Sequence, residues 1–232
     1  MKLVLFDLDG TLLWTDGAGR RAIHQALVGI LGTPGPIEGF RFDGRTDGEI
    51  VIHLTKGAGF APTVGLVTAV LERYVALLEL ELAKPTQHTT VYPGVMALLD
   101  ALEARSDCVL GLLTGNVREG ARLKLASGGI AFERFRTGAF GSDSAHRPDL
   151  AAVAQQRARD ELDLDLGGHD IVIVGDTPAD VTCGDAIGAR AIGVATGSFS
   201  VKQLLEAGAD AAFPDFSDTE AVLRAVFEDQ TR

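Results

Sequence analysis

The sequence has 232 residues, of which 46% are hydrophobic and 23% are charged, and its formal net charge at pH 7 is −11. A chain of this length and composition can bury a substantial core, which excludes a disordered protein and a mini-protein that needs disulfides to fold. The negative charge argues against DNA or RNA as a partner, because proteins bind the phosphate backbone mainly through Lys and Arg.

Two cysteines, Cys108 and Cys183, provide neither a disulfide framework nor a zinc site. The apolar run at residues 3–6 is shorter than the roughly 7–15 residues of a signal-peptide core. No other segment approaches the roughly 18 apolar residues that span a bilayer. We therefore expect a protein of a reducing compartment, located in the cytoplasm, with no membrane partner.

The first predicted strand, the apolar run at residues 3–6, is followed by a region of different character. From about residue 15 to residue 90, helical patterns occur over 18–31, 47–56 and 64–82, with no convincing strand. A polar stretch and the turn signal Tyr92-Pro93-Gly94 close this region. We predict an all-helical domain formed by residues 15–90, inserted into a core formed by residues 1–14 and 91–232.

The remainder of the chain alternates between helical patterns and short apolar runs. Because the runs lack alternation, they predict strands that are buried on both faces, over 109–113, 171–174 and 191–194, with a weaker strand over 211–213. Helices are predicted over 95–104, 118–126, 149–162, 179–187 and 219–227. This order is typical of an α/β fold with a Rossmann-like parallel sheet and helices on both faces.

Polar motifs follow three of the predicted strands directly. They are Asp7-Leu8-Asp9-Gly10-Thr11, Thr114-Gly115-Asn116 and Gly175-Asp176-Thr177-Pro178-Ala179-Asp180. In open parallel sheets, ligands bind beyond the carboxyl ends of the strands. We therefore expect the three motifs to meet at one edge of the sheet.

Each motif alone has a purely structural explanation, such as a turn at Asp-Gly or a capping box formed by Thr177 and Asp180. Together, however, four carboxylates at the ends of neighbouring strands would repel one another unless a cation or a proton lies among them. Magnesium bound by oxygen ligands meets this requirement. The motifs then also supply a nucleophile, a proton carrier and hydrogen-bond donors, which phosphoryl transfer needs.

The motifs, in this order and on these elements, resemble those of the haloacid dehalogenase superfamily, and the resemblance covers essentially the whole chain. The inserted helices resemble the cap of the phosphoglycolate phosphatase-like members, which selects small substrates. The resemblance implies a magnesium-dependent phosphatase that hydrolyses a small phosphorylated metabolite through an aspartyl-phosphate on Asp7.

The resemblance also implies roles for single residues. Asp7 is implied as the nucleophile and a metal ligand, Asp9 as the general acid and base that gives the metal its backbone carbonyl, and Asp176 as a direct ligand. Asp180 is implied in a supporting role. Thr114 is implied to hold the phosphoryl group, and the implied substrate contacts also include Gly10, Gly115 and Asn116.

The third family motif departs from the common pattern, because Arg147 stands where a lysine is usual. Arginine keeps its charge and can bind two oxygens, so it can neutralise an aspartyl-phosphate with a different geometry. Lys124, in the preceding helix, is the rival candidate, and Arg147 could also be a surface charge at a helix start. His146 is interpreted as a bystander.

Within the inserted region, the segment 42–47 resembles the loop with which this subgroup faces the active site. Arg45 would then contact an anionic leaving group. The alternative is structural, because Thr46 and Glu49 match a capping box at a helix start. Both readings remain open.

Other functions must explain the same carboxylates. Asp9 argues against the dehalogenase branch of the superfamily and leaves a phosphatase or a phosphomutase. A catalytically silent binding protein of the same fold remains an alternative because of the change to Arg147. A phospho-receiver domain is disfavoured, because its phosphoacceptor ends a middle strand and it lacks such an insert. The sequence leaves the oligomeric state open.

Overall fold

In the computed structural model, residues 1–228 are described. Six parallel strands form one sheet in the order β5-β4-β1-β6-β7-β8. Its centre is β1 (Lys2–Phe6), between β4 (Cys108–Thr114) and β6 (Ile171–Gly175). The other strands are β5 (Thr137–Phe140), β7 (Arg190–Val194) and β8 (Ala211–Phe213). The predicted α/β fold with a parallel sheet is confirmed.

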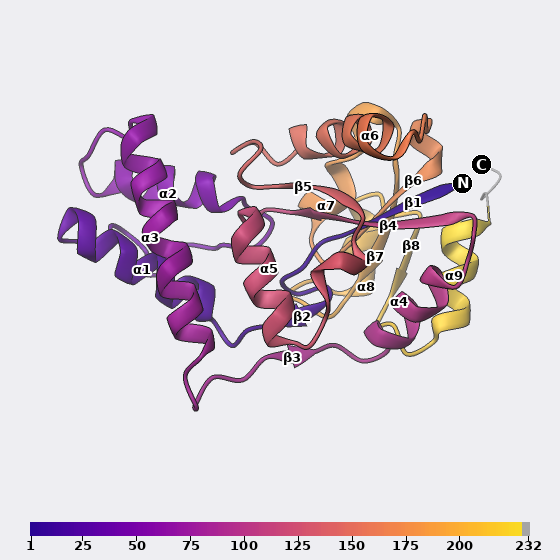
Figure 1. The fold of residues 1–232 in the computed structure, drawn as a ribbon, viewed down its shortest axis with the longest axis horizontal. Coiled ribbons are helices and arrows are strands. Elements are labelled where there is room, and N and C mark those ends of the chain that lie inside the picture. Colours follow the sequence, from indigo (N-terminus) through magenta and orange to yellow (C-terminus); the bar gives the residue numbers. More distant parts are fainter. Residues whose placement is uncertain (229–232) are drawn as a thin grey trace.

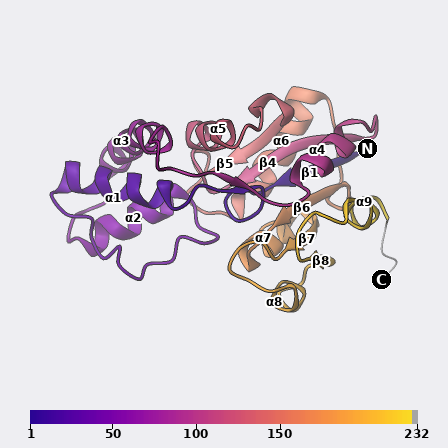
Figure 2. The ribbon, with the colours of Figure 1, turned by 90° about the horizontal axis from the view of Figure 1, so that it is seen from below.

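Helices cover both faces of this sheet, as Figure 2 shows. One face carries α4 (Val95–Glu103), α5 (Arg118–Ser127) and α9 (Thr219–Phe227), which share a hydrophobic cluster with Val4 and Phe6 of β1. Leu3 and Leu5 point to the opposite face. That face is covered by α6 (Asp149–Leu162), α7 (Pro178–Thr182) and α8 (Val201–Glu206).

Three further helices pack together beyond the carboxyl edge of the sheet (Figure 1, indigo to purple). They are α1 (Ala18–Leu31), α2 (Asp47–Gly57) and α3 (Val64–Leu82). Their buried side chains form a separate hydrophobic cluster, which Val117 at the start of α5 joins from the sheet side. We call α1, α2, α3 and the loops between them the helical unit.

The two connections between the helical unit and the sheet run side by side. They form an antiparallel pair, β2 (Leu13–Trp14) and β3 (Thr90–Val91). The chain therefore enters and leaves the helical unit through one short antiparallel pair of strands. The other contacts of the helical unit with the rest of the protein are made mainly by its own loops and by α3 against α5.

The predicted helix over 179–187 is wrong in its second half. The α-helix ends at Thr182, and a short 3-10 turn follows over Asp185–Ile187. Between them, Gly184 approaches the sheet so closely that a Cβ would lie 2.5 Å from Ile173 Cδ1. The chain therefore turns where the sequence pattern predicts a continuous helix. The strand β5, the helix α8 and the short pair β2 and β3 were not predicted.

No helix within residues 1–228 combines the length and the apolar character needed to cross a bilayer.

Candidate active site

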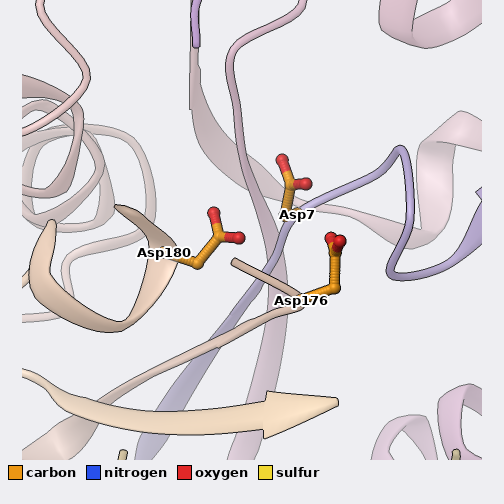
Figure 3. A group of neighbouring side chains, drawn as sticks. All are labelled: Asp7, Asp176 and Asp180. Carbon is orange, nitrogen blue, oxygen red and sulfur yellow. The ribbon is translucent and has the colours of Figure 1, made fainter. Parts of the chain in front are cut away.

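Three carboxylates meet at the carboxyl edge of the sheet, as Figure 3 shows. Asp7 follows β1, Asp176 follows β6, and Asp180 lies in α7. One oxygen of each carboxylate lies within 4.8 Å of the others, and all three side chains are buried. We call these residues the carboxylate cluster. The expected meeting of the first and third motifs is confirmed.

Local structure fixes each member of the cluster. Asp7 continues the pairing of β1 with β6, because its backbone N–H donates to Val174 O at 2.9 Å. Thr177 caps α7 in a capping box, and Asp180 Oδ2 accepts from Thr177 N at 2.9 Å and from its hydroxyl at 2.7 Å. Pro178 occupies the first turn, where a missing N–H costs nothing. The structural reading of this motif is therefore correct, and it also holds Asp180 beside Asp7.

A buried guanidinium lies among these carboxylates. Arg147 is 5% exposed, and its Nη2 donates to Asp7 Oδ1 at 2.9 Å and to Asp180 Oδ1. Its Nη1 reaches the second motif, at 3.0 Å from where a Cβ on Gly115 would lie. Arg147 is thus no surface charge, and it occupies the position beside Asp7 that the family resemblance gives to a lysine.

Two other basic residues, Lys124 and His146, make different contacts. Lys124 is also buried, but its Nζ donates to Asp9 Oδ2 at 2.5 Å. His146 is exposed and pairs with Asp149 at the start of α6. The geometry therefore favours Arg147 as the cation that faces Asp7.

The cluster holds more negative charge than Arg147 balances. Burial raises the pKa of Asp7 to about 7, an effect that Arg147 reduces and the charge of Asp180 increases. Burial also raises the pKa of Asp176 well above its ordinary value, and the charges of Asp180 and Asp7 add to the shift. Protonation or a bound cation would relieve this repulsion.

The cluster fits a small divalent cation that prefers oxygen ligands. Among the described residues, Asp7 Oδ2 and Asp176 Oδ2 accept no hydrogen bond, whereas both oxygens of Asp180 are engaged by Thr177 and Arg147. Asp7 and Asp176 are therefore the members best able to bind a metal directly. Asp180 is better suited to orient its neighbours.

The first motif also holds Asp176 from the opposite side. Thr11 Oγ1 donates to Asp176 Oδ1 at 3.0 Å. Gly10 has a φ of +87°, and a Cβ there would lie 2.4 Å from Asp176 Oδ2. Both the backbone conformation and the close approach require glycine at this position.

Asp9 belongs to a second set of polar contacts. Its Oδ2 accepts from Asn116 Nδ2 at 2.8 Å in addition to Lys124. Asn116 also donates to Thr114 Oγ1 at 2.9 Å, and its Oδ1 accepts from Lys124 at 2.6 Å. The structure therefore joins the first and second motifs through a network that includes Lys124.

Gly115 is the point at which the helical unit touches the second motif. Asp47 N donates to Gly115 O at 2.8 Å, and a Cβ on Gly115 would lie 2.1 Å from Arg45 O. The side chain of Arg45 extends along α2, where it pairs with Glu49 and lies 5.2 Å from the ring centroid of Phe40. Arg45 is thus at the site through its backbone, while its guanidinium is 40% exposed.

Thr46 and Asp47 attach the helical unit to the sheet. Thr46 caps α2 by accepting from Glu49 N at 3.0 Å, and its hydroxyl also donates to Ala145 O at 2.7 Å. The expected capping box is only half formed, because the Glu49 side chain pairs with Arg45 and does not return a hydrogen bond to Thr46 N. Asp47 Oδ2 accepts from Val117 N, the N-cap residue of α5, at 2.9 Å. The capping reading does not exclude a role at the site, because one segment serves both.

Sequence reasoning missed two buried polar residues beside this segment. Burial raises the pKa of Asp47 to about 6, although the charge of Lys124 and the Val117 hydrogen bond act in the opposite direction. Burial, with the nearby charge of Asp47, raises the pKa of Tyr74 well above its ordinary value. Asp47 is the last residue of the segment 42–47, which was expected to face the site. Tyr74 lies in the apolar helix α3, and no sequence motif indicated that it lines the cavity.

A cavity with a volume of about 610 Å³ lies between the helical unit and the sheet, and Asp7, Asp9 and Asp176 line it, whereas Asp180 and Thr114 lie behind its wall. Acidic and basic side chains line its floor at the strand ends. Aromatic side chains, Trp14, Phe40, Phe42 and Tyr92, line other parts of its wall. A cavity of this size and character suits a small molecule.

Comparisons with known proteins agree with this geometry. A model of the haloacid dehalogenase-like hydrolases matches residues 1–188. Phosphoglycolate phosphatase from Rhodospirillum rubrum is 29% identical over 219 residues, which cover 93% of this chain and 88% of that protein.

Solved structures share the fold at lower identity. A hydrolase from Pseudomonas syringae is 19% identical with a TM-score of 0.75, over 98% of this chain and 100% of the other. CbbY from Rhodobacter sphaeroides, solved in complex with phosphate, is 20% identical with a TM-score of 0.70, over 94% and 96% of the two chains.

Proposed function

The chain belongs to the haloacid dehalogenase-like hydrolases and is a phosphatase; we propose that it hydrolyses small-molecule phosphate monoesters with magnesium, through an aspartyl-phosphate on Asp7. One observation carries this proposal. Asp7 directly follows the central strand and belongs to the carboxylate cluster, with one oxygen held by Arg147 and the other without a hydrogen bond from the described residues. A carboxylate that is fixed but not fully engaged can act as a nucleophile.

The first step transfers the phosphoryl group from the substrate to Asp7. Asp7 Oδ2 attacks phosphorus, the bond to the leaving oxygen breaks, and Asp9 gives that oxygen its proton. The hydroxyl of Thr114 and the backbone amides beside it hold phosphoryl oxygens. Arg147, fixed between Asp7 and Asp180, balances the negative charge.

The second step returns Asp7 to its starting state. Asp9, now ionised, takes a proton from a water molecule that attacks phosphorus, and the acyl-phosphate bond breaks to release inorganic phosphate. The cavity position of Asp9, with its carboxylate 29% exposed, is compatible with reaching both the leaving oxygen and the water. Lys124 and Asn116 hold this carboxylate from the side.

Magnesium would be held by the carboxylates of Asp7 and Asp176 and by the backbone carbonyl of Asp9, with Asp180 in support. When bound, it supplies positive charge that offsets the repulsion within the cluster and the charge of the phosphoryl group. A readout independent of turnover is available. Magnesium should raise the Tm of the wild-type protein but not that of Asp176→Asn, and an equal rise in both would contradict this ligand set.

We also propose that residues 15–90 form a cap over a core of residues 1–14 and 91–232. The separate hydrophobic cluster of α1, α2 and α3, the paired connections β2 and β3, and the cavity between the two parts support this division. A cap that closes over the cavity would exclude bulk water and admit only small substrates.

Release of phosphate from p-nitrophenyl phosphate tests the proposed mechanism. Wild type should turn over only with magnesium, and Asp7→Asn should be inactive while retaining its fold. Asp163→Asn is a matched control, because Asp163 is exposed at a left-handed position that asparagine also tolerates. Activity in Asp7→Asn would refute the nucleophile, and an inactive wild type would favour a phosphomutase or a binding protein.

A further inference from the structure

Two hydrogen-bond donors converge on one oxygen of Asp9, a residue that lines the cavity. Lys124 Nζ donates to Asp9 Oδ2 at 2.5 Å, and Asn116 Nδ2 donates to the same oxygen at 2.8 Å. The other oxygen, Oδ1, accepts no hydrogen bond from any residue within 1–228. The two oxygens of this carboxyl group are therefore not equivalent, and Oδ1 is the one that remains available to a substrate.

This difference determines which oxygen of Asp9 carries a proton. A hydrogen atom on Oδ2 would meet the hydrogen atoms of the two donors that already point at that oxygen. A hydrogen atom on Oδ1 meets no such conflict, and Oδ2 continues to accept from both donors. When Asp9 is protonated, its proton therefore lies on Oδ1. When Asp9 is ionised, Oδ1 is the oxygen that is free to accept a proton from water.

Lys124 is fixed in this position by its surroundings. It is 5% exposed, and lysine is rarely buried to this extent unless it is paired. The backbone of α1 passes beside it at Gly19, where a Cβ would lie 3.3 Å from Lys124 Nζ. On the side of the helical unit, Asp47 is hydrogen-bonded to Tyr74, and its charge faces Lys124. The ammonium group is thus enclosed between the helical unit and Asp9.

Lys124 also sets the orientation of Asn116. An ammonium group can only donate, and Nζ lies 2.6 Å from Asn116 Oδ1, so the opposite end of the amide, Nδ2, is directed to Asp9. Asn116 Nδ2 also donates to Thr114 Oγ1 at 2.9 Å, and Asn116 N donates to the same oxygen at 3.3 Å. Both donors that Asp9 Oδ2 accepts therefore depend on Lys124, one directly and one through Asn116.

We infer that Lys124 is a positioning residue that keeps the proton of Asp9 on Oδ1, facing the leaving oxygen of the substrate. In the first step, the bond between phosphorus and the leaving oxygen breaks, the proton passes from Oδ1 to that oxygen, and Asp9 is left ionised beside Lys124. This inference rests on the proposed function, because the orientation of Asp9 matters only if Asp9 is the proton donor. Lys124 acts through Asp9, whereas Arg147 faces Asp7 directly.

Two substrates of similar shape test this inference. Phenyl phosphate has a poorer leaving group than p-nitrophenyl phosphate, whose phenolate leaves with little need for a proton. Lys124→Met should therefore lower kcat/KM about tenfold or more for phenyl phosphate and less than about threefold for p-nitrophenyl phosphate. An equal loss on both substrates would show a purely structural role for Lys124 and overturn the proposal, as would no loss on either.

A series of substituted phenyl phosphates gives a readout that does not depend on how much of a variant is folded. The slope of log kcat/KM against the pKa of the leaving phenol compares each protein only with itself. Wild type should give a shallow slope, and Asp9→Asn, which has no proton to give, should give a steep one. The slope for Lys124→Met should approach that of Asp9→Asn, and a slope equal to that of wild type would overturn the proposal.

Arg122→Met is the matched control, because Arg122 is a cation on the same helix that is 47% exposed and pairs with Glu119. Its slope should equal that of wild type, and a steeper slope like that of Lys124→Met would overturn the assignment to Lys124. Failure of the proposed function is distinguishable. In that case Asp7→Asn would retain activity, or Asp9→Asn would keep the shallow slope, whereas failure of this inference alone leaves Asp9→Asn steep and Lys124→Met shallow.

Discussion

The carboxylate cluster lies at the same cavity as Asp47, Tyr74 and Lys124, but the two groups are built differently. Asp7 and Asp176 directly follow neighbouring strands of a buried parallel sheet, so the pairing of the strands fixes their backbones. Asp47, Tyr74 and Lys124 instead come from α2, α3 and α5, and the backbone of α1 passes beside Tyr74 and Lys124 at Gly19. The first arrangement depends on the register of one sheet, and the second depends on how the helical unit docks.

This difference predicts which substitutions should change catalysis and which should change substrate selectivity. Substitutions at the strand ends should affect every substrate, because the same groups would handle the phosphoryl group in each case. Substitutions in the helical unit should affect substrates according to their leaving groups. A change at the strand ends that altered only selectivity would break this comparison.

The largest effect is expected from Arg147→Met. This change leaves Asp7 and Asp180 without their buried cation, and we expect kcat for all substrates to fall about a thousandfold. Arg147→Lys keeps the charge and should retain activity within about tenfold of wild type, because it loses only the two-oxygen geometry. Steady-state kinetics with p-nitrophenyl phosphate measures both. Near-normal turnover by the Met variant would remove Arg147 from the mechanism.

Asp7 should also make metal-free stability depend on pH. Its pKa is raised from 3.8 to about 7 in the folded state, so the folded protein holds a proton that the unfolded chain releases. The free energy of unfolding should therefore fall as pH rises from about 4 to 7, by roughly 4 kcal/mol relative to Asp7→Asn. Urea unfolding of both proteins with a chelator measures this difference, and parallel pH profiles would contradict it.

Thr46 tests the docking of the helical unit. Thr46→Val removes both the cap of α2 and the hydrogen bond to Ala145 O, so we expect a loss of about 1–2 kcal/mol in the free energy of unfolding. Thr46→Ser keeps the hydroxyl and should cost much less. Chemical denaturation compares the variants. If Thr46→Val and Thr46→Ser have the same free energy of unfolding, the Thr46 hydroxyl contributes nothing to docking.

The smallest effect is expected from Arg45→Ala. The guanidinium is partly exposed and paired with Glu49, so p-nitrophenyl phosphate hydrolysis should change by less than about twofold. The Michaelis constant for 2-phosphoglycolate should rise, because Arg45 is a cation on the cavity wall that could reach an anionic leaving group. A uniform loss on both substrates would remove Arg45 as a specificity residue.

Much of the fold follows from local sequence pattern. The central strands are continuous apolar runs that end in polar motifs, and the long amphipathic or apolar helices have clear limits. The missed strand β5 is only four residues long and contains Gly138, so it lacks a run of strand-forming residues. The missed helix α8 has six residues, although Ser200 and Gln203 form a capping box that could have indicated it.

The site divides in the same way. Asp7, Asp176 and Asp180 could be expected together because parallel strands bring their carboxyl ends to one edge. No sequence pattern indicated that Lys124 faces Asp9 or that Tyr74 faces the cavity. These contacts depend on which side of α3 and α5 turns toward the other elements, and α3 is apolar on much of its surface, so its pattern does not specify one face.

The central claim is that Asp7 carries the phosphoryl group, and covalent trapping tests it most directly. Enzyme that is turning over p-nitrophenyl phosphate with magnesium would be quenched in acid, reduced with borohydride and mapped by peptide mass spectrometry. An aspartyl-phosphate is reduced to homoserine, so conversion at Asp7 alone is the predicted result. Conversion at Asp9, or at no aspartate during active turnover, would contradict the account.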